Sequence, residues 1–387
     1  MAERRVYLDY NATAPLLPEA RQAALAALDL VGNPSSVHAE GRAARRIIET
    51  ARADVAALVG GSPENVVFTS GATEASTTLL TPDWRLGRAP LRLSHLYVCT
   101  ADHPCLLSGG RFPAERITPI GVDSNGLLRL DELKAALQAH DAAEGLPLVA
   151  VHLANNESGV IQPAGEIAEV VKAAGGVLVL DAVQAAGRIS LDLTDGCGDF
   201  LILSAHKIGG PKGVGAFVGR SNLMMPNPLV AGGGQEKGFR AGTENLPGIA
   251  GFGAAAKRAR SALDHVGSLR SLRDRIVGSV LRLAPDAEIF GRSVDRIANT
   301  VFFAVPGVKA ETAQIAFDLA GISLSAGSAC SSGKVGPSHV LKAMGVTQPE
   351  GGLRVSIGEG TSEEDIARFE AVLEQIVSRR NKTQQAA

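Results

Sequence analysis

One lysine in this sequence stands where an amine can do covalent chemistry. Lys207 closes the segment Ser204-Ala-His-Lys207, directly after the apolar run Phe200-Leu-Ile-Leu203. An amine at the end of a buried strand is costly unless it is used, although a solvated strand-end lysine is the commoner case for a lysine taken alone. Asp181 follows the preceding apolar run, Val177-Leu-Val-Leu180. We therefore expect its carboxylate and the Lys207 amine to face the same cleft.

An anion-binding segment completes this set. Ser70-Gly-Ala-Thr73 opens a predicted helix after the apolar run Val66-Val-Phe-Thr69, and it offers backbone N–H groups and hydroxyls to an anion. An amine that can form an imine, an acid for a ring nitrogen and a phosphate site are what pyridoxal phosphate requires of a protein. Each feature is weak alone, but their combination on one sheet indicates pyridoxal 5′-phosphate as the cofactor.

A candidate nucleophile is Cys330, in Ser325-Ala-Gly-Ser-Ala-Cys-Ser-Ser-Gly-Lys334. Small residues flank it on both sides and predict an exposed, mobile loop, whereas Cys99 lies in an apolar run that is typical of a buried thiol. Lys334 would favour the thiolate, which is the nucleophilic form. On the local sequence alone, a nucleophile and an incidental loop cysteine are equally well supported.

Short apolar runs precede these polar side chains and predict the sheet that positions them. The runs are apolar on both faces and alternate with helix-like stretches, the pattern of a mostly parallel sheet buried between helices in an α/β fold. Ligands of such sheets lie beyond the carboxyl ends of the strands, where the reactive residues gather here. The runs cover residues 66–69, 96–100, 148–154, 177–180 and 200–203.

The chain changes character past about residue 255. A helical stretch over 257–283, strands over 300–304, 322–325 and 353–357, and a final helix opened by a capping box at Thr361 and Glu364 predict a smaller α+β unit. We expect a large cofactor-binding domain over residues 17–254. A small domain would be built from residues 1–16 and 255–387 and would carry the Cys330 loop.

Composition excludes several classes of function. The 387 residues include 38 basic and 40 acidic side chains, a formal net charge of −2, whereas nucleic-acid binding favours a strongly basic surface. No apolar run approaches the ~18 residues of a membrane span. The four cysteines include no C-x-x-C pair, which argues against a zinc site. We expect a cytoplasmic protein that binds neither nucleic acid nor membrane and holds no metal.

The motifs, taken in order, resemble those of the pyridoxal-phosphate-dependent cysteine desulfurases of the nitrogen-fixation and iron–sulfur-assembly type. The resemblance runs almost end to end, and the order of the motifs is more specific than any one of them. It rests on Tyr7-Leu-Asp-Tyr-Asn-Ala-Thr-Ala14, Gly32-Asn-Pro-Ser-Ser-Val-His38, Thr69-Ser-Gly-Ala-Thr-Glu74, Asn155-Asn-Glu-Ser-Gly159, Asp181-Ala-Val-Gln184, Ser204-Ala-His-Lys207, Gly238-Phe-Arg-Ala-Gly-Thr-Glu-Asn245 and Gly327-Ser-Ala-Cys330.

The resemblance implies a fold-type I pyridoxal-phosphate enzyme of the class V aminotransferase family. Such an enzyme converts L-cysteine to L-alanine, leaves a persulfide on Cys330 and supplies sulfur for iron–sulfur cluster assembly. It further implies a homodimer and sulfur-acceptor proteins such as an iron–sulfur scaffold, with which Cys330 would transiently share iron.

The resemblance also assigns roles to single residues. Lys207 would hold the cofactor covalently, His103 would stack on its ring and move protons, and Cys330 would be the nucleophile. Asp181 would pair with the ring nitrogen and Gln184 with the ring hydroxyl. The phosphate would be held by Ala72, Thr73, Ser204 and His206, and by Thr243 of the neighbouring subunit. Asn155 would lie near the ring and the substrate carboxylate, which Arg354 would clamp.

Two departures from the family pattern stand out. Cys105 follows His103 closely and is either an inert small side chain or a second thiol that diverts sulfur. Phe239 stands where a basic residue is frequent in the family. The rival interpretations are a selenocysteine lyase, another fold-type I enzyme such as an aminotransferase, and a non-catalytic sulfur carrier or scaffold. An aminotransferase has no use for Cys330, and a carrier has none for Lys207 together with Asp181.

Overall fold

Parallel strands form the centre of the large sheet. The computed structural model describes residues 4–327, 338–347 and 351–386. Within these ranges the sheet has nine strands. Their order is β10 (Met224–Pro226), β3 (Asp83–Leu86), β4 (Ala89–Cys99), β6 (Leu146–His152), β7 (Val177–Asp181), β8 (Phe200–Ser204), β9 (Gly215–Gly219) and β2 (Val66–Thr69), with β5 (Ile117–Ile120) beside β4. Strands β5, β4, β6, β7 and β8 are mutually parallel. The predicted parallel centre is therefore confirmed.

The outer strands of this sheet are antiparallel. β2 pairs antiparallel with β9, and β9 with β8, while β3 and β10 continue the other edge in antiparallel pairs. β2 thus runs in the same direction as β8 and is separated from it by the reversed strand β9, yet β2 and β9 are as fully buried as the central strands. An apolar residue on each face reports burial and not strand direction, so the sequence pattern could not separate the two groups.

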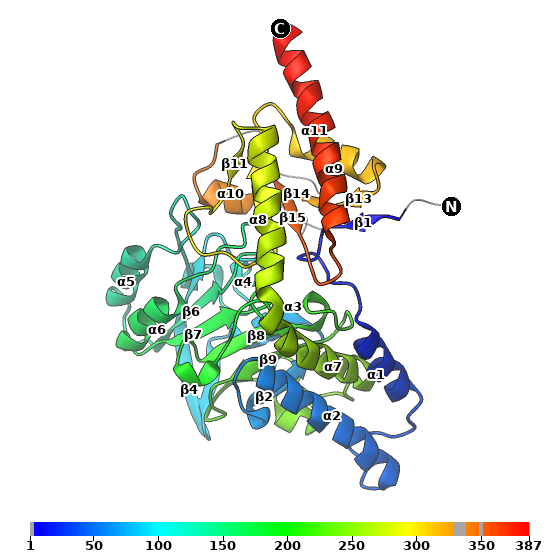
Figure 1. Ribbon diagram of the computed structural model, residues 1–387. Coiled ribbons are helices and arrows are strands. Elements are labelled where there is room, and N and C mark those ends of the chain that lie inside the picture. Colours follow the sequence, from blue (N-terminus) through cyan, green and yellow to red (C-terminus); the bar gives the residue numbers. More distant parts are fainter. Residues whose placement is uncertain (1–3, 328–337, 348–350, 387) are drawn as a thin grey trace.

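Helices cover both faces of the sheet, because alternate strand residues point to opposite sides. Val149 and Val151 of β6 belong to a hydrophobic cluster with α1 (Pro18–Leu28), α2 (Ala39–Leu58), α5 (Leu130–Gln138), α6 (Ala164–Ala173) and α7 (Leu246–Ala262). Leu148 and Ala150 face the opposite cluster, which includes residues of α3 (Ala72–Leu79) and α4 (Pro104–Leu107). Figure 1 shows α5 and α6 at one end of the helix layer and α1, α2 and α7 at the other.

A second group of elements has its own core. It contains the parallel pair β1 (Val6–Tyr7) and β13 (Ile322–Ser323), and a sheet in the order β11 (Glu288–Ile289), β12 (Thr300–Ala304), β15 (Leu353–Ser356) and β14 (Ser325–Ala326). The helices are α8 (Val266–Leu283), α9 (Ala310–Leu319), α10 (His339–Ala343) and α11 (Glu363–Ala386). Val6 and Leu8 pack there with Phe303, Phe317 and Phe369. This core supports the division into residues 17–254 and residues 1–16 with 255–387, which stays a prediction.

Several predicted boundaries shift. The stretch 257–283 is two helices, since α7 ends at Ala262 and α8 begins at Val266. The strand expected over 322–325 is split at Leu324, where the chain leaves its pairing with β1 and joins β15.

None of the helices in the described ranges combines the length and apolar character that a membrane crossing needs.

The capping box of α11 lies one residue later than predicted. The Ser362 N–H donates to Asp365 Oδ2 (2.9 Å), and the Asp365 N–H donates to Ser362 Oγ (3.2 Å). The Thr361 hydroxyl instead accepts the N–H of Gly358 (3.1 Å) and closes the preceding turn. Both registers have the sequence of a capping box, and this turn decides between them.

A buried ion pair fixes the segment after the glycine run at 232–234 to β2. Arg52 and Glu236 form two bonds of 2.6 and 2.8 Å, and their side chains are 2% and 1% exposed. Glu236 also accepts the N–H of Phe68 (2.8 Å), and Arg52 donates to the carbonyl of Val66 (2.9 Å). Glu236 and Lys237 have left-handed φ values of 45° and 58°. Such a conformation persists where surrounding contacts hold it, as this pair does.

We predict that Glu236→Gln lowers the free energy of unfolding by about 3 kcal/mol, because Arg52 loses its buried counter-charge and keeps only the half-exposed Glu49, 3.1 Å from its Nε. Glu144→Gln is the matched control, since it neutralises one partner of the exposed pair with Arg116. There the free energy of unfolding should change only slightly, because solvent screens both charges. Chemical denaturation of the three proteins measures both effects, and equal losses in the two variants would contradict the prediction.

Candidate active site

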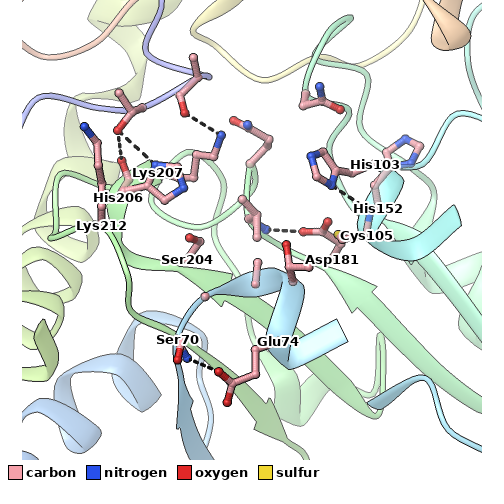
Figure 2. A pocket seen from close by; sticks show the side chains of 18 of the residues that line it. Ser70, Glu74, His103, Cys105, His152, Asp181, Ser204, His206, Lys207 and Lys212 are labelled. Atoms are coloured by element: carbon pink, nitrogen blue, oxygen red, sulfur yellow. Dashed lines mark hydrogen bonds between the residues drawn. The ribbon is translucent and has the colours of Figure 1, made fainter. Parts of the chain in front are cut away.

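A cavity of about 700 Å³ opens at the carboxyl ends of β6, β7 and β8. These strand ends form part of its wall, together with the start of α3 and the segment at Ala12 and Thr13. Figure 2 shows Lys207 and His206 on one side of the cavity and Asp181, Cys105 and His103 on the other. The amine and the acid that the sequence singled out therefore face one space.

Lys207 lies in a short turn directly after β8 (residues 205–207). Its Nζ donates to the carbonyl oxygens of Asn11 (2.6 Å) and Ala12 (2.9 Å). Those two residues follow β1, which belongs to the second core. The N-terminal segment thus crosses to the large sheet and helps to hold the amine at the cavity wall.

Asp181 is the buried last residue of β7. Its Oδ1 accepts the N–H of Val183 (2.9 Å). Burial raises the pKa of Asp181 to about 6, and the nearby Asp102 adds to this effect, while the Val183 N–H, His152 and Lys207 oppose it. A cationic partner in the cavity would stabilise the ionised form of this carboxyl group.

His103 caps the short helix α4. Its Nδ1 accepts the N–H of Cys105 (3.2 Å), so that a neutral ring carries its proton on Nε2. Burial, with Lys207 and His339 nearby acting in the same direction, lowers the pKa of His103 to about 4. The imidazole is therefore neutral at physiological pH.

The first turn of α3, where the sequence predicts an anion site, lies at the cavity wall. Ala72 and Thr73 line the cavity together with Ser204 and His206. A Cβ atom added to Gly215 would lie 2.7 Å from the Gly71 carbonyl carbon, so glycine in β9 lets this turn pack against the sheet. The N–H groups that open a helix attract anions, and the amines of Lys207 and Lys212 line the same cavity.

His206 is the second neutral imidazole of the cavity. Its Nδ1 lies 3.1 Å from the hydroxyl of Thr13. Burial lowers the pKa of His206 to about 4, and the charges of Lys207 and Lys212 act in the same direction.

The Gln184 side chain is held by hydrogen bonds at both ends of its amide. Its nitrogen donates to Asn11 O (3.0 Å), and its oxygen accepts from Arg188 (2.5 Å).

Most predicted cofactor residues meet in this cavity, but Asn155 does not line it. The Asn155 amide nitrogen donates to the carbonyl of Ala101 (3.0 Å), and its oxygen accepts the N–H groups of Glu157 (2.9 Å) and Ser158 (3.0 Å). Its neighbour Asn156 lines the cavity instead. The residues that gather there as predicted are Ala72, Thr73, His103, Asp181, Gln184, Ser204, His206 and Lys207.

Arg354 lies buried behind the cavity wall. It donates to Asp9 Oδ1 (2.7 Å), to the Ser325 hydroxyl (3.0 Å) and to the carbonyl of Asn156 (3.0 Å). A substrate carboxylate that binds Nη2 must therefore replace Asp9, whereas the buried Nε of Arg354 has no hydrogen-bond partner within the described ranges. Thr243 is exposed and outside the cavity, and Cys330 lies outside the described residues.

Sequence reasoning missed several cavity residues. Thr13, His152, Asn156 and Lys212 line the space, but no motif interpretation assigned them a role. Thr13 and Asn156 lie inside motifs that carry the family resemblance, which was an available signal. His152 had none, because a histidine at the end of an apolar run has the pattern of a core residue.

Comparison with known proteins gives one consistent family. Residues 6–369 match the model of the aminotransferase class-V family. The chain is 41% identical over 381 residues to a cysteine desulfurase of Cereibacter sphaeroides, with 96% of each chain covered. It is 38% identical over 388 residues to a cysteine desulfurase of Nostoc sp., with 97% of this chain and 93% of the relative covered.

A solved structure agrees with the sequence relatives. The X-ray structure of a NifS-like protein from Rickettsia africae matches with a TM-score of 0.86 at 30% identity, covering 97% of this chain and 100% of that one. The predicted fold class is thereby confirmed. The chain belongs to the aminotransferase class-V family and, within it, to the cysteine desulfurases.

Proposed function

We propose that this protein uses pyridoxal 5′-phosphate to convert L-cysteine to L-alanine and takes the sulfur as a persulfide on Cys330. The observation that carries the proposal is the joint position of Lys207, Asp181 and the start of α3 around one cavity. The relatives that are named cysteine desulfurases support the choice of substrate.

The residues of the cavity fit this cofactor. Lys207 supplies the amine, buried Asp181 gains from a cationic ring nitrogen, and the N–H groups at Ala72 and Thr73 suit a phosphate. A volume of about 700 Å³ is in the range of small-molecule sites. When bound, pyridoxal phosphate supplies an electron sink for charge that develops at the substrate Cα.

Lys207 and His103 handle protons in this proposal. Once released by the substrate amine, Lys207 removes the Cα proton. His103, neutral because of its lowered pKa, accepts the proton of the substrate thiol and later returns one to the product. Arg354 holds the substrate carboxylate after Asp9 has given way, with Asn156 at the cavity wall, while the Asn155 amide stays bonded to the backbone behind that wall.

Cys330 is the nucleophile in the sulfur step. Its thiolate attacks the substrate sulfur, an S–S bond forms, the C–S bond breaks, and the electron pair returns to the carbon skeleton, which is protonated to alanine. The other thiols support this assignment. Burial raises the pKa of Cys99, Cys105 and Cys197, so each of them is held as the unreactive thiol. Cys105 is then the inert side chain of the two options left open by the sequence.

The active form is a homodimer in this proposal. Exposed apolar side chains gather on α1 and the segment after it, where Leu28, Val31 and Val37 are 64%, 84% and 87% exposed. Thr243, which is exposed, reaches the phosphate of the second subunit.

Cys330 passes its sulfur to an acceptor such as an iron–sulfur scaffold, with which it transiently shares iron. Thiol chemistry of this kind places the protein in the reducing cytoplasm.

We predict that Lys207→Ala abolishes the yellow absorbance of lysine-bound cofactor and all turnover. Lys212→Ala is the matched control, because Lys212 is the other lysine that lines the described cavity. It should keep the colour, since its amine has no covalent role. Absorbance spectra after reconstitution with pyridoxal phosphate measure this, and a normal yellow band in Lys207→Ala would refute the assignment.

Cys330→Ala should keep the cofactor spectrum and lose sulfide release from L-cysteine in the presence of a reductant. Cys105→Ala should keep at least about half of the wild-type rate, because a buried thiol with a raised pKa contributes little thiolate. Sulfide and alanine are assayed in parallel. Full activity in Cys330→Ala, or its loss in Cys105→Ala, would reverse the roles of the two thiols.

The acid limb of the pH–rate profile should lie well below the usual histidine range. The pKa of His103 is lowered to about 4, so the neutral base is present above that value and is lost as the pH falls through it. We expect kcat/KM for L-cysteine to lack any limb near pH 6.5 that depends on His103, and His103→Gln to lower kcat/KM by about 100- to 10,000-fold. A limb near pH 6.5 that disappears in His103→Gln would contradict this.

A further inference from the structure

A buried hydrogen-bond chain lies below the cavity and has no place in the mechanism derived above. Asp102 Oδ1 accepts from the backbone N–H (2.8 Å) and from Nδ1 (2.6 Å) of His152, and Asp102 Oδ2 accepts the N–H of Cys99 (2.8 Å). The side chains of Asp102 and His152 are 0% and 5% exposed. A buried carboxylate with several donors is stable in the ionised form.

Gln162 determines which nitrogen of His152 carries the proton. The Gln162 oxygen accepts the N–H of Leu128 (2.9 Å), so its amide nitrogen points the other way. That nitrogen donates to the carbonyl of Gly126 (2.8 Å) and lies 3.0 Å from His152 Nε2. An amide nitrogen only donates, so His152 Nε2 is the acceptor and the ring proton is on Nδ1, facing Asp102. His152 is therefore neutral, and Asp102 keeps a full negative charge.

The chain reaches both sides of the active site. His152 is the last residue of β6, its register partner on β7 is Asp181, and it lines the cavity. Asp102 directly precedes His103, and its backbone carbonyl accepts from His339 Nε2 (2.9 Å). One buried network thus holds the turn that carries His103 and puts a charge beside Asp181.

We propose that Gln162, His152 and Asp102 are positioning residues, which hold His103 in place and keep one permanent negative charge beside Asp181. The cavity floor then favours a cationic ring nitrogen more strongly than Asp181 does alone. This inference rests on the proposed function, since it concerns the cofactor that Asp181 would face. The contribution of Asp102 to the raised pKa of Asp181 supports it.

The other groups around Asp181 do not supply this charge. Cys105 in α4 is a neutral thiol because its pKa is raised. His103 is neutral because its pKa is lowered. Lys207 acts in the opposite sense, since its positive charge lowers the pKa of Asp181, and His152 would do the same only in its doubly protonated form. The local negative charge that opposes ionisation of Asp181 is thus the carboxylate of Asp102.

The same residues could also be considered as a metal site. Ligand atoms of Cys99, Asp102 and His152 lie within 4.8 Å of one another. However, His152 Nδ1 already donates to Asp102, and burial together with Asp102 keeps the pKa of the Cys99 thiol well above its usual value. A neutral thiol is a poor ligand, so the contacts favour the hydrogen-bond chain.

The decisive variant is Gln162→Glu, which changes a residue outside the cavity. A carboxylate in this position accepts a proton from His152 Nε2, so His152 becomes doubly protonated and positive. Nitrogen chemical shifts of ¹⁵N-histidine-labelled, cofactor-free protein report this, with His152→Asn used for assignment. We expect a neutral Nδ1–H ring in the wild type and an imidazolium in Gln162→Glu. An imidazolium in the wild type, or a neutral ring in Gln162→Glu, would overturn the inference.

The reconstituted enzyme gives a second readout. A positive His152 opposes the charge of Asp102, so the pH midpoint of the visible cofactor absorbance should fall by about 0.5 unit or more in Gln162→Glu. Gln162→Met is the matched control, because it removes the same hydrogen bonds without adding charge. Its midpoint should stay within about 0.2 unit of the wild type. Equal shifts in the two variants would show a merely structural role.

Two further outcomes separate this inference from the proposed function. A wild-type protein that never binds pyridoxal phosphate refutes the function, while the histidine shifts still decide the protonation of His152. A stoichiometric metal ion in the purified protein refutes the hydrogen-bond chain and leaves the function standing. If Gln162→Glu does not fold, the wild-type shifts and Gln162→Met still test the assignment.

Discussion

Parallel pairing of β6, β7 and β8 is the constraint on which the rest of this structure depends. In register, His152 lies beside Asp181, and Asp181 lies beside Ile202, two residues before Ser204. Because parallel strands end at the same edge of a sheet, the polar residue that closes each strand is delivered to one cavity. Lys207 follows in the next turn. A register slip of one residue would turn these side chains toward the opposite face.

Burial then sets the charge of each group in the cavity. Removal from water lowers the pKa of His103 and His206 and raises that of Asp181 and Cys105, because it disfavours every charged form. The imidazoles and the thiol are consequently neutral. Buried charges elsewhere persist where hydrogen bonds compensate them, as three donors do for Asp102 and as Glu236 does for Arg52.

The N-terminal segment connects the two cores at the active site. Asn11 accepts from both Lys207 and Gln184 through its carbonyl, and Asp9 binds Arg354. In our proposal Lys207 binds the cofactor and Arg354 binds the substrate carboxylate. The positions of both side chains therefore depend on hydrogen bonds to a few residues after β1. Movement of the second core relative to the sheet would change the hydrogen bonds of Lys207 and Arg354.

The sequence by itself determined the parallel centre of the sheet and the family, and it predicted that Lys207, Asp181 and the start of α3 would face one cavity, because apolar runs and motif order are local properties of the chain. Only the tertiary structure decided that β2 joins the sheet through the reversed strand β9, that Asn156 and not Asn155 lines the cavity, and that Asp9 binds the Arg354 guanidinium. It also brought together Gln162, His152 and Asp102, which no motif connects. Each of these outcomes depends on which segments pack together. Packing between segments far apart in the chain decides which partner each strand or polar group receives.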